Sequence, residues 1–353
     1  MNNLKKPIIV SIAFGLTTIS AYAQSNVNLS GYTYGGIAFN SGGASTRTAM
    51  GAPASFMITS TEELGGGNRM ILKWESGFSL KDGSLENPSS FWDKQAYIGM
   101  QGTWGTVRAG RLYTPAFATL ALTVDPTETY GLFTSTNLVE LNDVRLPSGI
   151  IYNTPGFNPW TYVSNGFYGT VAYYFGDSPS GGASKNSSKD FNVGYAEPGQ
   201  YEIEFSGHRK NTYASGASDV NKTGYILGGY YIIGPAKLYL GYSWAHANDR
   251  FTNSKTVDDS DLILGASYRI QENQRITGSF INHNDKTSAN NDAWQLGLGY
   301  EYFFSKRTRI MAAIAKIHNK NSTQHFKIAN GYSGTTSATA GTQTIAIGLV
   351  RNF

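Results

Sequence analysis

The chain has 353 residues, no cysteine and a formal net charge of +4, so it uses no disulfides and lacks the strongly basic balance of a nucleic-acid-binding protein. Only 15% of its residues are charged, whereas 41 are glycine, 23 tyrosine and 18 phenylalanine, a composition typical of a turn-rich β protein. The length allows one large all-β domain or two ordinary domains.

The N-terminal segment has the pattern of a secretory signal peptide. Lys5 and Lys6 precede the apolar run "PIIVSIAFGLTTIS", and "AYA" at 21–23 supplies the small residues that signal peptidase reads. A membrane anchor is the alternative, but the run is shorter than the roughly 20 residues of a spanning helix, and no later run is long enough. We therefore expect a signal peptide at 1–23 and one domain at 24–353.

Further along the chain, apolar residues alternate with polar or small ones, most regularly at 201–208, 237–246, 261–270 and 294–302. In the last of these stretches Leu296 and Leu298 fall on one face, and Gln295 and Gly297 fall on the other. A period of two residues is that of a β-strand with one apolar face. We expect the polar-face side chains, Gln295 among them, to meet water.

The C-terminal stretch "TIAIGLVRNF" (344–353) shows the same period, because Ile345, Ile347, Leu349 and Phe353 share one side. Chain ends are usually polar and poorly ordered, so a terminal aromatic residue in register with an apolar face indicates the end of a strand. Something apolar must cover that face.

Two kinds of connection separate the predicted strands. Tight turns are indicated at 62–67, 197–200, 234–236, 271–274 and 305–308, and long polar connections at 176–190 and 319–341. Short turns on one rim and long loops on the other are typical of an up-and-down antiparallel sheet. The pass along the chain predicts about 16 strands, and no linker divides them.

A soluble sandwich is one way to cover the apolar faces, but two observations favour a closed transmembrane β-barrel. Aromatic residues gather at strand ends, as in an interfacial girdle: Trp74, Trp104, Trp160, Trp244, Trp294, Tyr302 and Phe353. The opposite faces are too polar for a dry core, since they carry Lys73, Glu202, Glu204, Arg269, Gln295 and Glu301. In a barrel, lipid covers the apolar face, water meets the polar face, and closure removes the sheet edges.

Several blocks resemble the general porins of Gram-negative bacteria, in particular the trimeric porins of Neisseria- and Burkholderia-like bacteria. They are "NVNLSGYTYGGIAF" after the signal, "TEELGGGNRMILKWESGF" (61–78), "KQAYIGMQGTWGTVRAGRLYTP" (94–115), "IIYNTPGF" (150–157) and the final "GLVRNF". The resemblance implies a 16-stranded barrel in the outer membrane, usually a homotrimer, with the third long loop folded inward. It also implies that Phe353 is read by the outer-membrane assembly machinery and closes the barrel against residues 27–39.

The resemblance places a pore constriction in the loop at about 113–144. Its acidic candidates are Asp125, Glu128, Glu140 and Asp143, and the basic candidates on the facing wall are Arg69, Lys73, Arg108, Arg111 and Arg145. An acidic loop opposite a basic wall creates a transverse field that orients dipolar solutes. We expect Asp125 and Glu128 to face Arg111 and Arg145.

The chain departs from the family pattern at three points. Ser55 and Thr59 stand where related second strands carry arginines, and Tyr34 stands where the first strand often has an acid. Strict alternation also turns Arg111 outward, so its role in the pore requires a bulge at Gly110. The ion preference is therefore not predicted.

Other functions compete with a channel for small hydrophilic solutes and ions. A substrate-specific channel is favoured if Tyr34, Tyr97 and Tyr239 form a stacking track for sugars, and an adhesin or receptor is suggested by the long outer loops. No catalytic triad or metal-ligand spacing is present, so we expect neither an enzyme nor a cofactor or metal. The expected partners are other copies of the chain, outer-membrane lipid, lipopolysaccharide and the assembly machinery.

Overall fold

The computed structural model describes residues 25–42, 46–80, 82–128, 131–139, 143–155, 157–158, 164–176, 186–214, 218–321, 325–328 and 341–353. The predicted signal peptide and the candidate Glu140 lie outside these ranges. No helix within them is long and apolar enough to cross a membrane.

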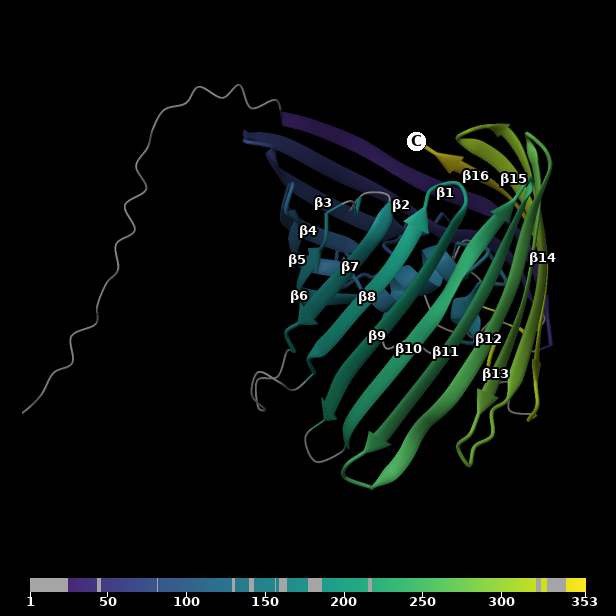
Figure 1. Ribbon diagram of the computed structural model, residues 1–353. Coiled ribbons are helices and arrows are strands. Elements are labelled where there is room, and N and C mark those ends of the chain that lie inside the picture. The colour runs from purple at the N-terminus through teal and green to yellow at the C-terminus, as the bar shows by residue number, and fades with distance from the viewer. Residues whose placement is uncertain are drawn as a thin grey trace, which may run out of the picture.

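Within the described residues, sixteen antiparallel strands form one closed barrel (Figure 1). In chain order they are β1 Ser25–Ser41, β2 Thr46–Gly65, β3 Asn68–Phe78, β4 Gln95–Gly102, β5 Gly105–Tyr113, β6 Arg145–Asn153, β7 Gly166–Tyr174, β8 Ser188–Glu197, β9 Tyr201–Ala214, β10 Ser218–Ile233, β11 Ala236–Asp249, β12 Ser254–Gln271, β13 Gln274–Asp285, β14 Ala293–Ser305, β15 Thr308–Asn319 and β16 Gln343–Asn352. Every strand pairs with its neighbours in the sequence, and β1 pairs with β16. The predicted fold class is confirmed.

The two ends of the chain close the barrel. β1 and β16 are paired from Tyr32–Asn352 to Ser41–Gln343. Phe353 continues the ladder, because its backbone N–H donates to the carbonyl of Gly31 at 2.9 Å and its carbonyl accepts from the Gly31 N–H at 3.0 Å. The predicted closure of the terminal strand against the first strand is therefore confirmed.

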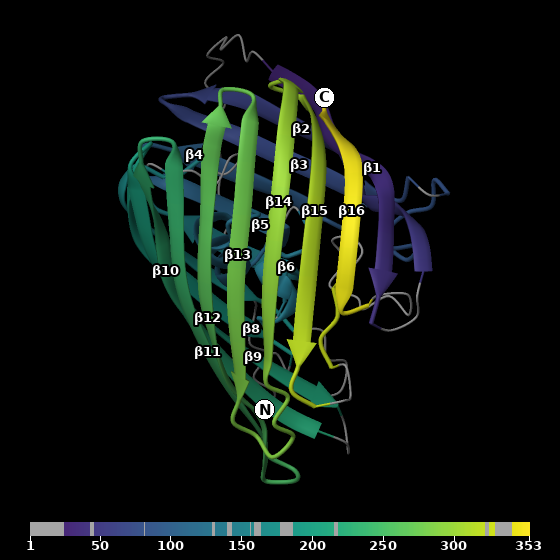
Figure 2. The same cartoon turned by 90° about the vertical axis from the view of Figure 1, so that its right-hand side faces the viewer.

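The connections differ between the two rims, as predicted. Figure 2 shows the short turns that follow β12 and β14 at the same rim as the C-terminus, with the longer connections at the opposite rim. The segment between β6 and β7 is an exception, because residues 154–165 form a longer connection on the short-turn rim. Its Phe157 is buried and lies under the guanidinium of Arg108 at 5.7 Å.

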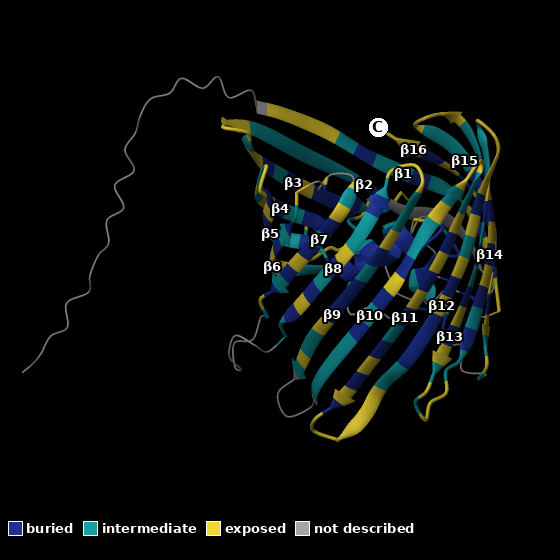
Figure 3. Cartoon of the chain, viewed as in Figure 1, coloured by how far each residue is buried: buried dark blue, intermediate teal, exposed yellow. Residues whose placement is uncertain are grey.

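The two faces of the wall have opposite character, which Figure 3 shows as alternating buried and exposed bands along the strands. On β14, Leu296 and Leu298 are 55% and 53% exposed, whereas Gln295 between β13 and β15 is fully buried. On β16, Ile345 and Ile347 are likewise exposed on the outside. A large exposed apolar surface on every strand is unfavourable in water and favourable in lipid.

A charge on the outer face tests this assignment. Leu298 lies between Leu296 and Tyr300 on the outer side of β14, so Leu298→Arg should cost about 2–4 kcal/mol in lipid vesicles. Ile270→Arg lies on the same face beside the turn after β12, where the cost should fall to about 0–1 kcal/mol. Denaturant titration in vesicles measures both; equal costs would show that this face does not meet the bilayer core.

The terminal phenylalanine gives a second test. Deleting Phe353 removes two backbone hydrogen bonds to Gly31 and the last aromatic residue of the outer face. We expect export to continue while the amount of heat-resistant barrel in the outer membrane falls sharply. Equal amounts of folded barrel from the deletion and the parent would rule out an assembly role for this residue.

Candidate functional site

The long connection between β5 and β6 runs through the inside of the barrel. It contains α1 (Pro115–Ala118), the π-helix η1 (Thr119–Val124) and the 3₁₀ turn η2 (Ser135–Asn137), and Figure 1 shows these coils enclosed by the strands. The Thr114 hydroxyl caps α1 by accepting a hydrogen bond from the Phe117 N–H at 3.2 Å. Because α1 contacts β7–β9 and η1 contacts β9–β11, the loop crosses to the wall opposite its origin.

Glycines on the inner wall make room for this loop. A Cβ added at four of these glycines would lie within 2.1–2.7 Å of a loop side chain. Val124 lies against Gly228 and Gly241, Pro126 against Gly265, and Phe133 against Gly297. In the sequence these glycines fall on the polar faces of their strands. In the structure they leave space on the inner wall, and apolar side chains of the loop pack into that space.

Gln295 fixes the loop on this seat. Its Nε2 donates to the carbonyls of Phe133 at 2.8 Å and Thr134 at 3.2 Å, and its Oε1 accepts from Asn137 Nδ2 at 2.7 Å. The side chain faces inward as predicted, but the expectation that it meets water was wrong, because the loop covers it completely. A second contact, from the Thr123 hydroxyl to Glu204 at 2.8 Å, holds the loop on β9.

Asp125 organises the loop from within. Its carboxylate accepts hydrogen bonds from the N–H and hydroxyl of Thr127 at 2.8 and 2.7 Å, the Thr134 hydroxyl at 2.8 Å and the Ser135 N–H at 2.7 Å. Burial raises the pKa of this carboxyl above its ordinary value, and the hydrogen bonds oppose that shift. Asp125 is fully buried, so the structure places it inside the loop and not at the water-filled waist.

Glu128 is the acidic residue of the loop that lies near positively charged residues of the barrel wall. It is exposed, and it interacts electrostatically with Lys237 of β11 and Arg275 of β13. The ammonium of Lys237 lies 3.6 Å from the ring centre of Tyr230 and 4.8 Å from that of Tyr239. The expected pairing with Arg111 and Arg145 is therefore replaced by one with β11 and β13.

The candidate acid at the end of the loop has another partner. Asp143 forms an ion pair with Lys210 of β9 at 2.5 Å and also interacts with Lys222 of β10. Burial raises the pKa of the Asp143 carboxyl, and the nearby lysines oppose the rise. This contact ties the end of the loop to the same wall that holds its beginning.

The basic candidates on β3 and β5 lie at two different heights along the barrel axis. Lys73 and Arg108 are buried on the inner wall, where Lys73 pairs with Glu75 at 3.2 Å and Arg108 donates to Asn153 Oδ1 at 3.0 Å. Arg69 is exposed and lies close to the turn between β2 and β3. It therefore belongs to the short-turn rim and not to the level of the loop.

Arg111 and Arg145 lie close together. Arg111 Nε donates to the Asp93 carbonyl at 2.6 Å, and the guanidinium interacts electrostatically with Arg145 and with the acids Asp93 and Asp143. A pore role for Arg111 required a bulge at Gly110, and the β5–β6 register does shift after Gly110, whose φ is +140°, but not by an extra residue on β5. The extra residue lies on β6, where Ser148 has a φ of +53°.

One lumenal cluster was not among the candidates. It lies near the short-turn rim of β11–β15 and consists of Lys237, Arg269, Arg275, Arg309 and Glu301. Glu301 accepts a hydrogen bond from Arg275 Nε at 2.6 Å and forms an ion pair with Arg309 at 2.8 Å. Arg269 lies directly opposite Arg275 on the neighbouring strand. The alternation places Lys237, Arg269 and Glu301 on inner faces, but only the register between hairpins brings these charges together.

A closed barrel with an apolar outside, a polar lumen and a loop across that lumen defines an outer-membrane channel. Comparison with known proteins agrees, because the Gram-negative porin family matches residues 10–322. The chain belongs to this family, and it is an outer-membrane porin. The predicted resemblance is thereby confirmed.

Individual relatives are distant. Outer membrane porin protein 32 of Delftia acidovorans is 25% identical, covering 99% of this chain and 100% of its own length. Major outer membrane protein P.IB of Neisseria meningitidis serogroup B is 24% identical over 71% of this chain and 72% of its own. The anion-selective porin from Comamonas acidovorans shares the fold with a TM-score of 0.72 at 21% identity, covering 94% of this chain and 100% of that one.

The seat of the loop can be tested by filling it. Gly297→Val places a branched side chain where Phe133 packs, so the loop should move off the wall and the single-channel conductance should rise. Gly278→Val is the matched control, since its nearest neighbour is 3.6 Å away, and it should leave conductance unchanged. Planar-bilayer recordings measure both variants; parental conductance in folded Gly297→Val would show that this contact does not set the pore width.

Proposed function

We propose that this porin is a general diffusion channel for small hydrophilic solutes and ions, and that it prefers anions. The observation that carries the preference is the lumenal cluster of Lys237, Arg269, Arg275 and Arg309, whose four cations outnumber the acids Glu301 and Glu202 beside them. The loop contributes little compensating charge, because Asp125 is enclosed by hydrogen bonds and Asp143 is paired with Lys210.

Glu128 gives the passage a transverse field. Its carboxylate lies on the loop segment that packs on β10–β14, near the cations Lys237 and Arg275, and β3–β6 lie on another side of the barrel. Such a field orients dipolar solutes and slows apolar ones, which cannot exploit it. A second group of cations, Lys73, Arg108, Arg111 and Arg145, adds positive potential on the wall of β3–β6. The solved relative described as anion-selective supports the same sign.

The working form is proposed to be a homotrimer that is exported with a signal peptide at 1–23 and inserted by the assembly machinery, which reads Phe353. An outer membrane protein of Vibrio cholerae described in a trimer form shares the fold, with a TM-score of 0.69 at 16% identity, and this supports the oligomer. Outer-membrane lipid and lipopolysaccharide are the partners that the exposed apolar faces require.

A sugar-specific channel is the second candidate. Tyr34, Tyr97 and Tyr239 all face inward, but they lie on β1, β4 and β11, which are not neighbouring strands. Tyr239 lies close to Tyr230, with ring centres 6.0 Å apart beside Lys237. Liposome swelling with a size series distinguishes the two functions, because a general porin gives rates that decline smoothly with solute mass.

The ion preference is tested by charge reversal. Lys237→Glu should move the reversal potential in a KCl gradient toward cations, and Glu128→Gln should move it toward anions. At an effective dielectric constant near 20, one charge in the waist changes the barrier for an ion by about 1 kcal/mol or more. Concentrated salt should shrink both shifts, because the Debye length falls to about 3 Å at 1 M.

Arg351→Gln is the control, because this cation lies at the same rim on the outer side of β16. It should leave the reversal potential unchanged. Folded Lys237→Glu and Glu128→Gln channels with the parental reversal potential would remove these residues from the permeation route.

A further inference from the structure

The connection between β6 and β7 turns back into the barrel from the short-turn rim. Thr154 is fixed on β7, because its N–H donates to the Gly169 carbonyl at 2.9 Å and its hydroxyl accepts from the Gly169 N–H at 2.9 Å. The Phe157 N–H donates to the Thr154 carbonyl at 3.5 Å, and Pro155 follows Thr154 in this turn. Phe157 is thereby brought back against the inner wall, where it is buried.

Arg108 of β5 contacts two aromatic rings at this place. Its Cζ lies 5.2 Å from the ring centre of Tyr97 on β4 and 5.7 Å from that of Phe157. Its Nη2 donates to Asn153 Oδ1 at 3.0 Å, and Asn153 Nδ2 donates to the Thr170 hydroxyl at 2.8 Å. A planar guanidinium is attracted to aromatic faces, because the face of the ring carries negative charge. These contacts hold the cation at the inner wall.

The residues around Arg108 come from two different parts of the fold. Tyr97, Asn153 and Thr170 belong to β4, β6 and β7, so the backbone ladder of the wall fixes them. Phe157 belongs to the rim connection, so its ring can be removed without a change in that ladder. Arg108 is only 2% exposed, and Phe157 is part of its cover. Because the Coulomb energy falls with distance, this cover limits how strongly the cation acts on an ion in the lumen.

We propose that Phe157 is a specificity-determining residue of the channel, because its ring keeps passing anions out of contact with the guanidinium of Arg108. In the parent, Arg108 adds to the potential of the β3–β6 wall only from a distance. Without the ring, anions approach the guanidinium directly beside Tyr97. This inference rests on the proposed channel function and not on the sign of its ion preference, because each measurement is a change from the parent.

The experiment uses the assembled channel in planar bilayers with a KCl gradient at low salt. Phe157→Ala should raise the anion-to-cation permeability ratio about fivefold, because one uncovered charge acts on ions at an effective dielectric constant of about 20. Arg108→Gln alone should leave the ratio close to the parental value, since this charge is covered. Adding Arg108→Gln to Phe157→Ala should abolish the rise.

A single introduced thiol reports the cover directly, because the chain has no cysteine. Thr170→Cys places the thiol next to Asn153, at a position that is 5% exposed in the parent. An anionic methanethiosulfonate should modify it about tenfold faster in Phe157→Ala, which corresponds to about 1.4 kcal/mol of lost packing. A residue that only stabilised the fold would lower the amount of heat-resistant barrel and leave this rate unchanged.

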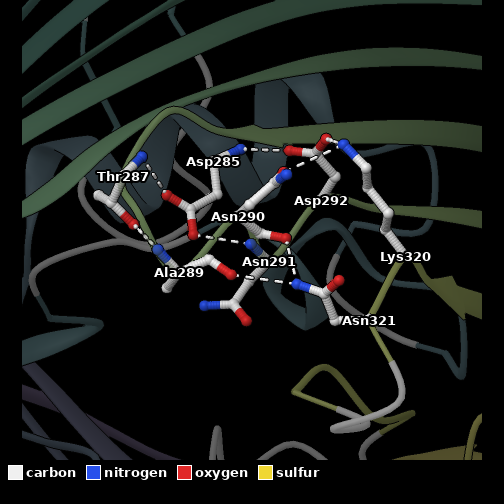
Figure 4. A network of polar contacts seen from close by, with 8 residues as sticks. All are labelled: Asp285, Thr287, Ala289, Asn290, Asn291, Asp292, Lys320 and Asn321. Atoms are coloured by element: carbon white, nitrogen blue, oxygen red, sulfur yellow. Dashed lines mark hydrogen bonds and ion pairs between the residues drawn. The ribbon is translucent and has the colours of Figure 1, made fainter.

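Two control variants separate this role from a general loosening of the barrel. Phe167→Ala removes a ring that is 85% exposed on the outer face of β7, and it should leave both measurements at the parental value. Asn321→Ala loosens a connection at the opposite rim. Figure 4 shows the contacts of that connection, where Asn321 Nδ2 donates to the carbonyls of Ala289 at 3.1 Å and Asn290 at 2.7 Å. This variant should also behave like the parent.

Three results would overturn the proposal. The first is a parental permeability ratio in folded Phe157→Ala, whether or not the thiol becomes reactive. The second is a rise that persists after Arg108→Gln is added, because another charge would then be responsible. The third is fast modification of Thr170→Cys in the parent, which requires no change at Phe157. None of these results alters the outcome of Lys237→Glu, so the proposed ion preference is tested separately.

Discussion

The structure depends on one constraint: in hydrocarbon, each backbone N–H and C=O must find its partner within the protein. A sheet meets this requirement only when its first and last strands pair, and here the ladder between β1 and β16 continues to Phe353. Closure then fixes which side of every strand meets lipid, because side chains alternate strictly between the faces. The lumen and its polar lining are consequences of that closure.

A barrel of this size does not fill itself with side chains, so the width of the passage is set by a segment that is not part of the wall. The loop after β5 fulfils that function because the wall offers it matching surfaces. Phe133 occupies the space over Gly297, and Gln295 donates hydrogen bonds to the loop carbonyls of Phe133 and Thr134. The same inner face thus carries seats for the loop on some strands and charges for permeating ions on others.

Much of this architecture was predictable from the sequence, because a period of two residues reports the face of a strand without knowledge of its neighbours. The outer position of Leu296 and the closing strand follow from such local patterns. What covers an inward side chain does not, since it depends on where a distant loop crosses the lumen. Gln295 and Asp125 were therefore assigned to water, although one is covered by the loop and the other is enclosed in it.

The partners of Glu128 likewise could not be predicted from the sequence. Alternation puts Lys237 and Arg275 on inner faces, but their angular position around the barrel comes from the combined register of all hairpins. Resemblance to a family pattern pointed to Arg111 and Arg145, which instead gather with Asp93 and Asp143 where the loop leaves the wall. A single shift in register at one hairpin is enough to exchange the charges that face the loop.

Because side chains alternate between the two faces of each strand, charged residues have different roles on the lumenal face and on the lipid-facing side of the wall. Inside, like charges are brought together because water and a shared carboxylate stabilise them, as Glu301 does for Arg275 and Arg309. Outside, hydrocarbon offers no such compensation, and on β15 and β16 the cations Lys316 and Arg351 stand only at the two ends of the apolar band. An inward charge on such a strand therefore acts on the permeating solute, whereas an outward charge marks where the membrane ends and acts on its lipid headgroups.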